Sequence, residues 1–249
     1  MNNFTQSIIA QPLEQFEIIY LGSIGGIPIN NSLIYLIFVY LVIRFFFGLA
    51  LMNMRIVPLN IQIFVEQIYN FVFGLVKQQI NVSGYAYFPA VFALFLFILV
   101  ANLIGMSLYS FTLTSHVTVA FTLSFSFFIA IVIVGVLVQK AAFVNTFIPQ
   151  GVPKVLKPFL IAIEVISYFS RPLSLGIRLF SNLMSGHTLL AILANFTFLI
   201  SQKNLLMAAV PFILIAVIVG LEVMIAGLQA YVFTVLFCIY LNDSLHGSH

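Results

Sequence analysis

The chain has 249 residues, of which 63% are hydrophobic and only 6% are charged, and its mean hydropathy is +1.19. This composition is typical of an integral membrane protein and leaves no polar stretch long enough for a soluble domain, so we expect a single membrane domain over residues 1–249. The net charge of +3 is small and its carriers are scattered, which argues against nucleic-acid binding, and the lone Cys238 excludes an intramolecular disulfide.

The first part of the chain predicts one span and one helix of a different kind. Residues 1–17 have no basic region followed by an apolar core, so we predict no cleavable signal. Residues 32–53 are apolar apart from Arg44 and are long enough to cross the bilayer. In residues 59–80, polar side chains alternate with apolar ones at helical spacing, which predicts an amphipathic helix lying in the membrane interface.

Two further spans are predicted at residues 85–109 and 117–138. The loop between them carries no lysine or arginine, whereas the segments at the opposite ends of the spans are basic. The basic residues of those segments are Arg55, Lys77, Lys140, Lys154 and Lys157. By the positive-inside rule, the N-terminus lies outside and these basic segments lie inside.

The last third of the chain contains two apolar stretches, residues 159–200 and 205–241, that are far longer than the ~20 residues needed to cross. As helices they would extend roughly 63 and 55 Å, so they must be steeply tilted or broken, with Pro172 and Pro211 as the candidate breaks. The short connection between them predicts an antiparallel hairpin. We therefore expect an all-α integral membrane protein with about five membrane-embedded helices, one interfacial amphipathic helix and a long tilted C-terminal hairpin.

A stripe of polar residues follows the first arm of this hairpin at steps of three or four residues. Its members are Glu164, Ser167, Arg171, Ser174, Arg178, Asn182 and Ser185. Residues at this spacing share one helical face, and in apolar surroundings that face must contact protein or water. Arg178 is the most informative member, because an arginine near the bilayer centre costs at least ~2.5 to 3.5 kcal/mol and cannot escape by deprotonation. Transport is the favoured role for Arg178, while the serines fit transport or structural packing equally well.

Folding the hairpin about residue 202 or 203 pairs residues whose numbers sum to roughly 405. This pairing places Glu222 near Asn182 and His187, and Gln229 near Arg178. A lone membrane carboxylate relays protons or pairs more often than it is simply neutralised by burial, so we favour a role for Glu222 in transport. For His187 we favour function over helix packing.

With these motifs identified, the chain resembles subunit a of the rotary F-type ATP synthase over nearly its whole length. The segments that carry the resemblance are Pro12–Glu17, Asn102–Met106, Glu164–Tyr168, Ser174–His187 and Gln229–Leu236. The family pattern places a carboxylate and a histidine in positions matching Glu222 and His187 in its mitochondrial members, whereas many bacterial members exchange the two. The resemblance therefore implies the mitochondrial inner membrane over a bacterial plasma membrane. Pro172 departs from the family pattern.

The resemblance also implies a mechanism and a set of partners. The chain would be a proton-channel subunit rather than an enzyme, and it would use no cofactor or metal. Its partners would be a c-ring, the peripheral stalk and other membrane subunits, within a lipid bilayer. Arg178 would be the essential charge facing the ring carboxylates. Protons would enter beside Asn182, His187, Glu222 and Gln229, and leave beside Glu164 and Ser167.

Two other classes stay open at this stage. A secondary transporter would also place charges at the midplane, but it usually shows paired halves, and no internal repeat is visible. A structural membrane subunit of a respiratory complex would not need Arg178 beside a polar stripe. The sequence favours the proton over the sodium ion without excluding sodium.

Overall fold

The computed structural model describes residues 17–24, 27–52, 58, 60–106, 113–140, 143, 156–202 and 205–246. Several features predicted above lie outside these ranges, namely residues 12–16, Asn53, Arg55, residues 107–109 and Lys154. The described residues form two compact units. Unit 1 comprises residues 1–44, 97–116 and 179–229, and unit 2 comprises residues 45–96, 117–178 and 230–249. Each unit is described by itself.

Nearly all of the described chain is helical, as predicted. The α-helices are α2 (Asn31–Met52), α3 (Asn60–Ile80), α4 (Phe88–Gly105), α5 (Val117–Gln139), α6 (Lys157–Ser201) and α7 (Leu205–His246). Two 3-10 helices, η2 (Asn81–Tyr87) and η3 (Leu113–Ser115), precede α4 and α5. Within the described residues, five helical segments are long and apolar enough to cross a membrane, which confirms the predicted number. They are 31–50, 84–105, 117–139, 157–201 and 207–245.

Helix α3 is the α-helix that does not qualify as a span among the described residues. Its buried side chains lie three or four residues apart on one face. They are Val72, Leu75, Val76 and Ile80. The exposed surface of α3 carries polar side chains, where the Gln62 amide donates to Glu66 Oε1 at 2.8 Å, together with large apolar side chains such as Phe64 and Phe71. The predicted amphipathic character is therefore confirmed, while its place in the membrane interface stays a prediction.

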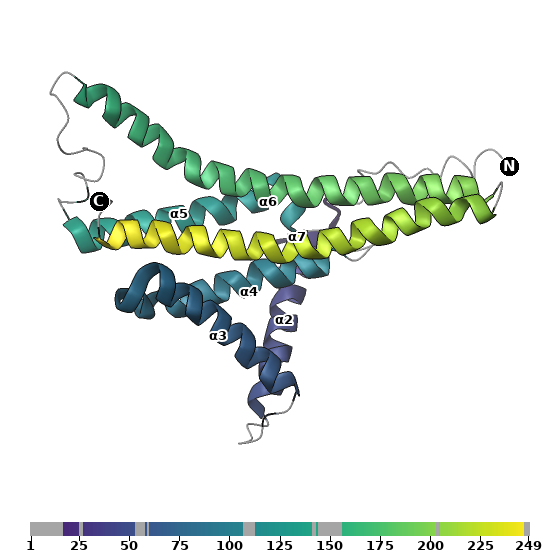
Figure 1. The fold of residues 1–249 in the computed structure, drawn as a ribbon, viewed down its shortest axis with the longest axis horizontal. Coiled ribbons are helices and arrows are strands. Elements are labelled where there is room, and N and C mark those ends of the chain that lie inside the picture. The colour runs from purple at the N-terminus through teal and green to yellow at the C-terminus, as the bar shows by residue number, and fades with distance from the viewer. Residues whose placement is uncertain are drawn as a thin grey trace. The chain divides into compact units, whose positions relative to one another are not determined.

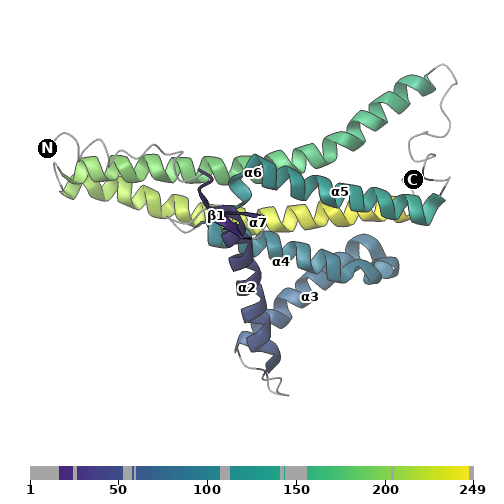
Figure 2. The same ribbon diagram turned by 180° about the vertical axis from the view of Figure 1, so that it is seen from behind.

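A short β-hairpin was not predicted. Strands β1 (Tyr20–Ile24) and β2 (Ile27–Asn30) pair antiparallel in unit 1, directly before α2 (Figure 2). Only Gly25 and Gly26 separate the strands in the sequence, and such pairs favour two-residue hairpin turns. The Asn31 side chain donates to the Glu17 carbonyl at 3.0 Å and so connects the start of α2 to the segment before β1.

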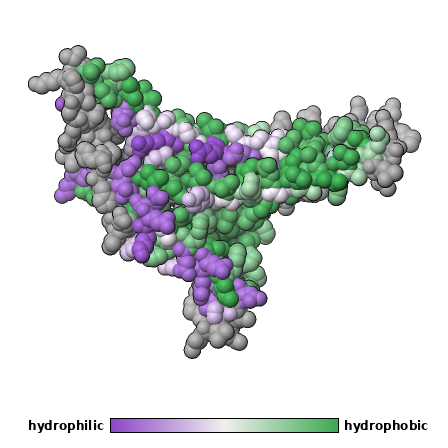
Figure 3. All heavy atoms as spheres, viewed as in Figure 1, coloured by the Kyte–Doolittle hydropathy of each residue, from purple (hydrophilic) through white to green (hydrophobic). Residues whose placement is uncertain are grey.

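Helices α6 and α7 each continue through their internal proline, so neither is broken at Pro172 or Pro211, while a kink at these prolines stays a prediction (Figure 1). Helix α7 also continues to His246, five residues beyond the predicted end at residue 241. In unit 1, their segments 179–201 and 205–229 run antiparallel and expose many large apolar side chains, such as Phe196 at 54% and Val210 at 73%. Toward the right-hand end of Figure 3, hydrophobic residues cover the visible face of these segments, as expected for helices in contact with lipid.

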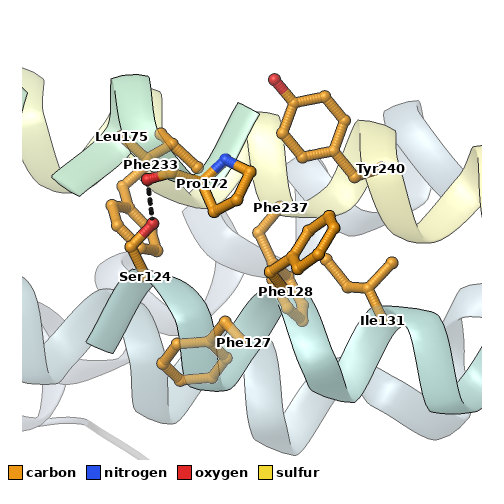
Figure 4. Close-up of a pocket in the computed structure, with 9 residues that line it drawn as sticks. All are labelled: Ser124, Phe127, Phe128, Ile131, Pro172, Leu175, Phe233, Phe237 and Tyr240. Atoms are coloured by element: carbon orange, nitrogen blue, oxygen red, sulfur yellow. Dashed lines mark hydrogen bonds between the residues drawn. The ribbon is translucent and has the colours of Figure 1, made fainter. Parts of the chain in front are cut away.

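In unit 2, Pro172 is accommodated by packing against α5 and α7. The Ser124 hydroxyl of α5 donates to the Pro172 carbonyl, and the two side chains lie at the edge of a small apolar cavity (Figure 4). Aromatic rings supply much of the cavity wall. The lining residues are Ser124, Phe127, Phe128, Ile131, Pro172, Leu175, Phe233, Phe237 and Tyr240. Because this cavity is almost wholly apolar, it is a feature of helix packing and not a candidate for proton transfer.

Candidate functional site

The carboxylate of Glu222 lies against the backbone of Gly186 in unit 1. A Cβ atom added to Gly186 would overlap with Glu222 Oε1 and would lie 3.0 Å from Cδ and 3.2 Å from Cγ. The missing Cβ of Gly186 therefore leaves the space between α6 and α7 that the end of the Glu222 side chain occupies. The absent side chain makes room for a carboxylate that is 9% exposed in an apolar environment.

Asn182 and Gln229 form a second contact between α6 and α7. Asn182 lies one turn from Gly186, and Gln229 lies two turns from Glu222. The Asn182 amide donates to Gln229 Oε1 at 3.1 Å. Gln229 itself is 4% exposed, so this contact is shielded from solvent. A buried amide pair of this kind fixes which atoms of each amide remain for other partners, because the bonded carbonyl oxygen of Gln229 turns its Nε2 group the other way.

The observed pairing differs by about one helical turn from the prediction for Gln229. Gln229 pairs with Asn182, four residues along α6 from the position that the sum of roughly 405 predicted, while Glu222 lies beside Gly186, next to the predicted neighbour His187. The reason is that helical side chains point toward the N-terminus of their own helix. In an antiparallel hairpin, this tilt moves the contacts between side chains away from the backbone pairing. The residue numbers of two contacting side chains therefore sum to more than the backbone pairing alone predicts.

A small cavity opens between the polar side chains of unit 1. Its lining combines three amide side chains and one carboxylate with apolar residues of α6 and α7. The lining residues are Asn102, Asn182, Leu183, Glu222, Ile225, Ala226 and Gln229. The cavity has room for about one water molecule. Asn102 comes from α4 and was not among the predicted site residues.

Several polar atoms around this cavity are buried without a hydrogen-bond partner among the described residues. They are Asn102 Nδ2, Gln229 Nε2 and both carboxyl oxygens of Glu222. A buried polar atom without a partner costs about 1 to 3 kcal/mol, so such a concentration requires an explanation other than stability. The predicted uptake residues Asn182, Glu222 and Gln229 therefore lie together around one polar cavity.

His187 is 4% exposed and lies in unit 1, where it contacts the backbone of Gly105 at the end of α4. It does not line the cavity, but it follows directly after Gly186, whose backbone contacts Glu222. The structure thus places the fourth predicted uptake residue one position from the contact between α6 and α7.

The two arginines of the α6 polar stripe have different surroundings, and both belong to unit 2. Arg171 lies 3.7 Å from the Asp243 carboxylate, and its guanidinium carbon lies 5.2 and 4.8 Å from the ring centroids of Tyr168 and Tyr240. Asp243 was not identified from the sequence, because the predicted helix ended before it. Arg171 is thereby neutralised within the chain.

Arg178 is exposed on α6, and no carboxylate among the described residues lies within ion-pair distance of it. Its sequence neighbour Ile177 is also exposed, at 50%, so the surface around this charge is partly apolar. A permanent charge on such a surface of a membrane helix must meet an anion or water that lies outside the described residues.

The predicted release residues Glu164 and Ser167 also belong to unit 2. Glu164 is half-buried and Ser167 is exposed, and the Ser167 carbonyl accepts a hydrogen bond from the Ser170 hydroxyl at 2.7 Å. Within the described residues, no group of three or more His, Cys, Asp or Glu side chains could hold a metal ion.

Comparison with known proteins identifies the family to which the chain belongs. The sequence profile of the family described as ATP synthase A chain matches residues 32–242. The chain belongs to the ATP synthase subunit a family. Members of this family are the proton-translocating subunit of the membrane sector, and with its five apolar spans this one is a multi-pass membrane protein.

Relatives named ATP synthase subunit a align with almost the full chain. The relative from Acanthamoeba castellanii is 44% identical over 248 residues, which cover 97% of this chain and 100% of the relative. The relative from Chondrus crispus is 43% identical over 248 residues, with coverage of 97% and 98%. The relative from Marchantia polymorpha is 44% identical over 246 residues, with coverage of 94% and 98%. All three organisms are eukaryotes, and the resemblance inferred from the motifs is confirmed.

Proposed function

We propose that this chain is the proton-conducting stator subunit of a mitochondrial ATP synthase, and that it forms two offset half-channels against a rotating c-ring. Protons enter through a half-channel beside Asn182, His187, Glu222 and Gln229. They leave beside Glu164 and Ser167. The uptake half of this proposal is supported by the polar cavity of unit 1, where buried polar atoms without partners surround space for about one water molecule.

The observation that carries the proposal is the contrast between Arg171 and Arg178. Arg171 is paired with Asp243 and covered by two tyrosine rings, whereas Arg178 is exposed without an acidic partner among the described residues. A ring that presents one membrane-embedded carboxylate after another would supply the anion that Arg178 requires. The partner that best fits this charge is therefore the c-ring.

The same charge explains how rotation is coupled to proton movement. A ring carboxylate that has taken up a proton is neutral and can face lipid at tolerable cost. When it reaches Arg178, attraction to the guanidinium favours the ionised carboxylate, and the proton leaves through the release half-channel. Because each proton crossing supplies about 2.3 kcal/mol per 100 mV, a direct leak between the half-channels would waste the driving force. Arg178 also prevents that leak, because a fixed positive charge repels a proton passing directly between the half-channels.

The mitochondrial inner membrane is the proposed location, with the peripheral stalk and other membrane subunits as further partners. The eukaryotic relatives support this location, and so does the arrangement of His187 and Glu222, which follows the mitochondrial form of the family pattern.

Substitution of Arg178 tests the proposal in vesicles that contain the assembled complex. We expect Arg178→Ala to abolish proton-driven ATP synthesis while the amount of assembled complex stays close to normal, because the Arg178 side chain is exposed on α6. Arg178→Lys should fail or nearly fail as well, since lysine lacks the planar fork and can lose its proton in an apolar site. Normal proton pumping by Arg178→Ala vesicles would refute the proposal.

A further inference from the structure

The cavity of unit 1 has a polarity that follows from two of its three amide side chains, those of Asn102 and Gln229. Thr114 is fully buried and donates its hydroxyl to Asn102 Oδ1 at 3.0 Å, and Asn102 is itself fully buried. With its carbonyl oxygen occupied, the Asn102 amide presents its Nδ2 group to the cavity that it lines. The hydroxyl of Thr114 therefore decides which end of Asn102 faces the cavity.

Gln229 is oriented in the same way by a different residue. Its Oε1 accepts from the Asn182 amide at 3.1 Å, which leaves Nε2 as the group without a partner among the described residues. Two amides thus present N–H donors, and the carboxyl oxygens of Glu222 present acceptors. Donors and acceptors are complementary, but no hydrogen bond joins these three side chains directly within the described chain.

We propose that this cavity is a binding site for one ordered water molecule that holds the Glu222 carboxylate in its ionised form. The water accepts hydrogen bonds from Asn102 Nδ2 and Gln229 Nε2 and donates one to Glu222. Three hydrogen bonds are the usual number for a buried water, and the cavity has room for about one. Asn102 is a new member of the uptake site, and Thr114 is a positioning residue that acts through Asn102.

The same polarity disfavours a metal cation as the occupant. A cation would need carbonyl oxygens as ligands, but those of Asn102 and Gln229 are turned toward Thr114 and Asn182. The amide N–H groups that face the cavity would repel a positive ion and attract the oxygen of a water.

The inference rests on the proposed uptake path through Glu222 and describes how that path is kept ready. An ionised carboxylate in an apolar site needs donors, or it takes up a proton and keeps it. A water fixed by two amides supplies a donor after each proton has moved on. Loss of that water should therefore slow proton flux without stopping assembly.

Four variants of the assembled complex in membrane vesicles test this site. Asn102→Leu removes the donor, Thr114→Val removes the orienting hydroxyl at nearly constant shape, and Thr114→Ser retains it. Glu222→Gln removes the acceptor charge. We would record the infrared O–H stretch of buried water, identified by its shift in water labelled with oxygen-18, together with the rate of proton flux.

We expect the wild-type complex and Thr114→Ser to show the water band, and Asn102→Leu and Thr114→Val to lose it. Flux should fall about fivefold in the last two variants, the effect of one hydrogen bond of about 1 kcal/mol, and Thr114→Ser should restore most of it. A high-resolution map of the wild-type complex needs no variant. It should show a water within about 3.2 Å of Asn102 Nδ2, Gln229 Nε2 and a Glu222 oxygen.

The outcomes separate this inference from the proposed function. If Glu222→Gln stops flux, but Thr114→Val and Asn102→Leu keep both the band and the wild-type rate, the water site is refuted and the uptake path stands. Absence of the band from the wild-type complex, or of the water from its map, has the same meaning. If Glu222→Gln leaves flux unchanged, the uptake path itself is wrong.

Discussion

Gly186→Ala is a small change that should displace the Glu222 carboxylate. An added Cβ would overlap with Glu222 Oε1 and lie 3.0 Å from Cδ, whereas ordinary Cβ contacts begin at 3.4 Å. The carboxyl carbon must therefore retreat by at least about 0.4 Å, and the nearer oxygen by more. All of the close atoms belong to a side chain and none to the backbone, so the helices need not separate.

The effect on stability should be small, while the effect on transport should be large. Alanine is more favourable than glycine within a helix by about 1 kcal/mol, which offsets a strained Glu222 rotamer at about 0.5 to 1.5 kcal/mol. A misplacement of about 1 Å in a reacting group can lower a rate about 100-fold, so we expect Gly186→Ala to reduce proton flux at least about 10-fold. Proton flux and the thermal stability of the assembled complex would be measured in the same vesicles.

A matched control is available on α7. A Cβ at Gly220 meets nothing within 4 Å, so Gly220→Ala changes helix propensity in the same way without contacting Glu222. Shortening the acid should also relieve the overlap, so Glu222→Asp should be less harmful in a Gly186→Ala background than alone. Equal flux in Gly186→Ala and Gly220→Ala would show that the position of Glu222 does not limit transport.

Three further changes probe the rest of the site. Glu222→Gln and His187→Ala should be non-additive in proton-pumping rate, with a coupling of about 0.5 to 3 kcal/mol as an activation difference, and strict additivity would argue against a shared path. In a Cys238→Ser background, Glu164→Cys and His187→Cys should react with water-soluble thiol reagents from opposite sides of the membrane, and similar labelling from one side would contradict the two half-channels. Arg171→Ala should destabilise the complex by about 1 to 3 kcal/mol through loss of the Asp243 and tyrosine contacts, and an unchanged melting temperature would show that those contacts contribute little.

The helices were predictable because membrane spans are read from length and apolarity alone. Helix α5, for example, was predicted at residues 117–138 and ends at Gln139. The end of α7 was missed because Asn242, Asp243 and Ser244 resemble a polar terminus in the sequence. In the structure, Gln139 Nε2 donates to the Ser244 carbonyl at 2.7 Å and Asp243 meets Arg171, so tertiary contacts satisfy those polar groups.

The uptake residues could be proposed from spacing, but their contacts could not. Pairing residues whose numbers sum to roughly 405 placed Glu222 in the correct region. The same pairing displaced the predicted partner of Gln229 by about one turn of α6, because it ignored the direction of helical side chains. Asn102 could not be identified as a site residue, since nothing in the sequence indicates that it bonds to Thr114 and lines the same cavity as Glu222. The family resemblance was confirmed, whereas the roles of the individual site residues stay predictions.

The position of Arg178 relative to the ring decides the central claim. A map of the assembled complex should show the Arg178 guanidinium facing the ring, within a hydrogen bond or one bridging water of a ring carboxylate as it passes. A map in which the ring packs against another face of α6, with Arg178 directed toward lipid or toward a different subunit, would contradict the account.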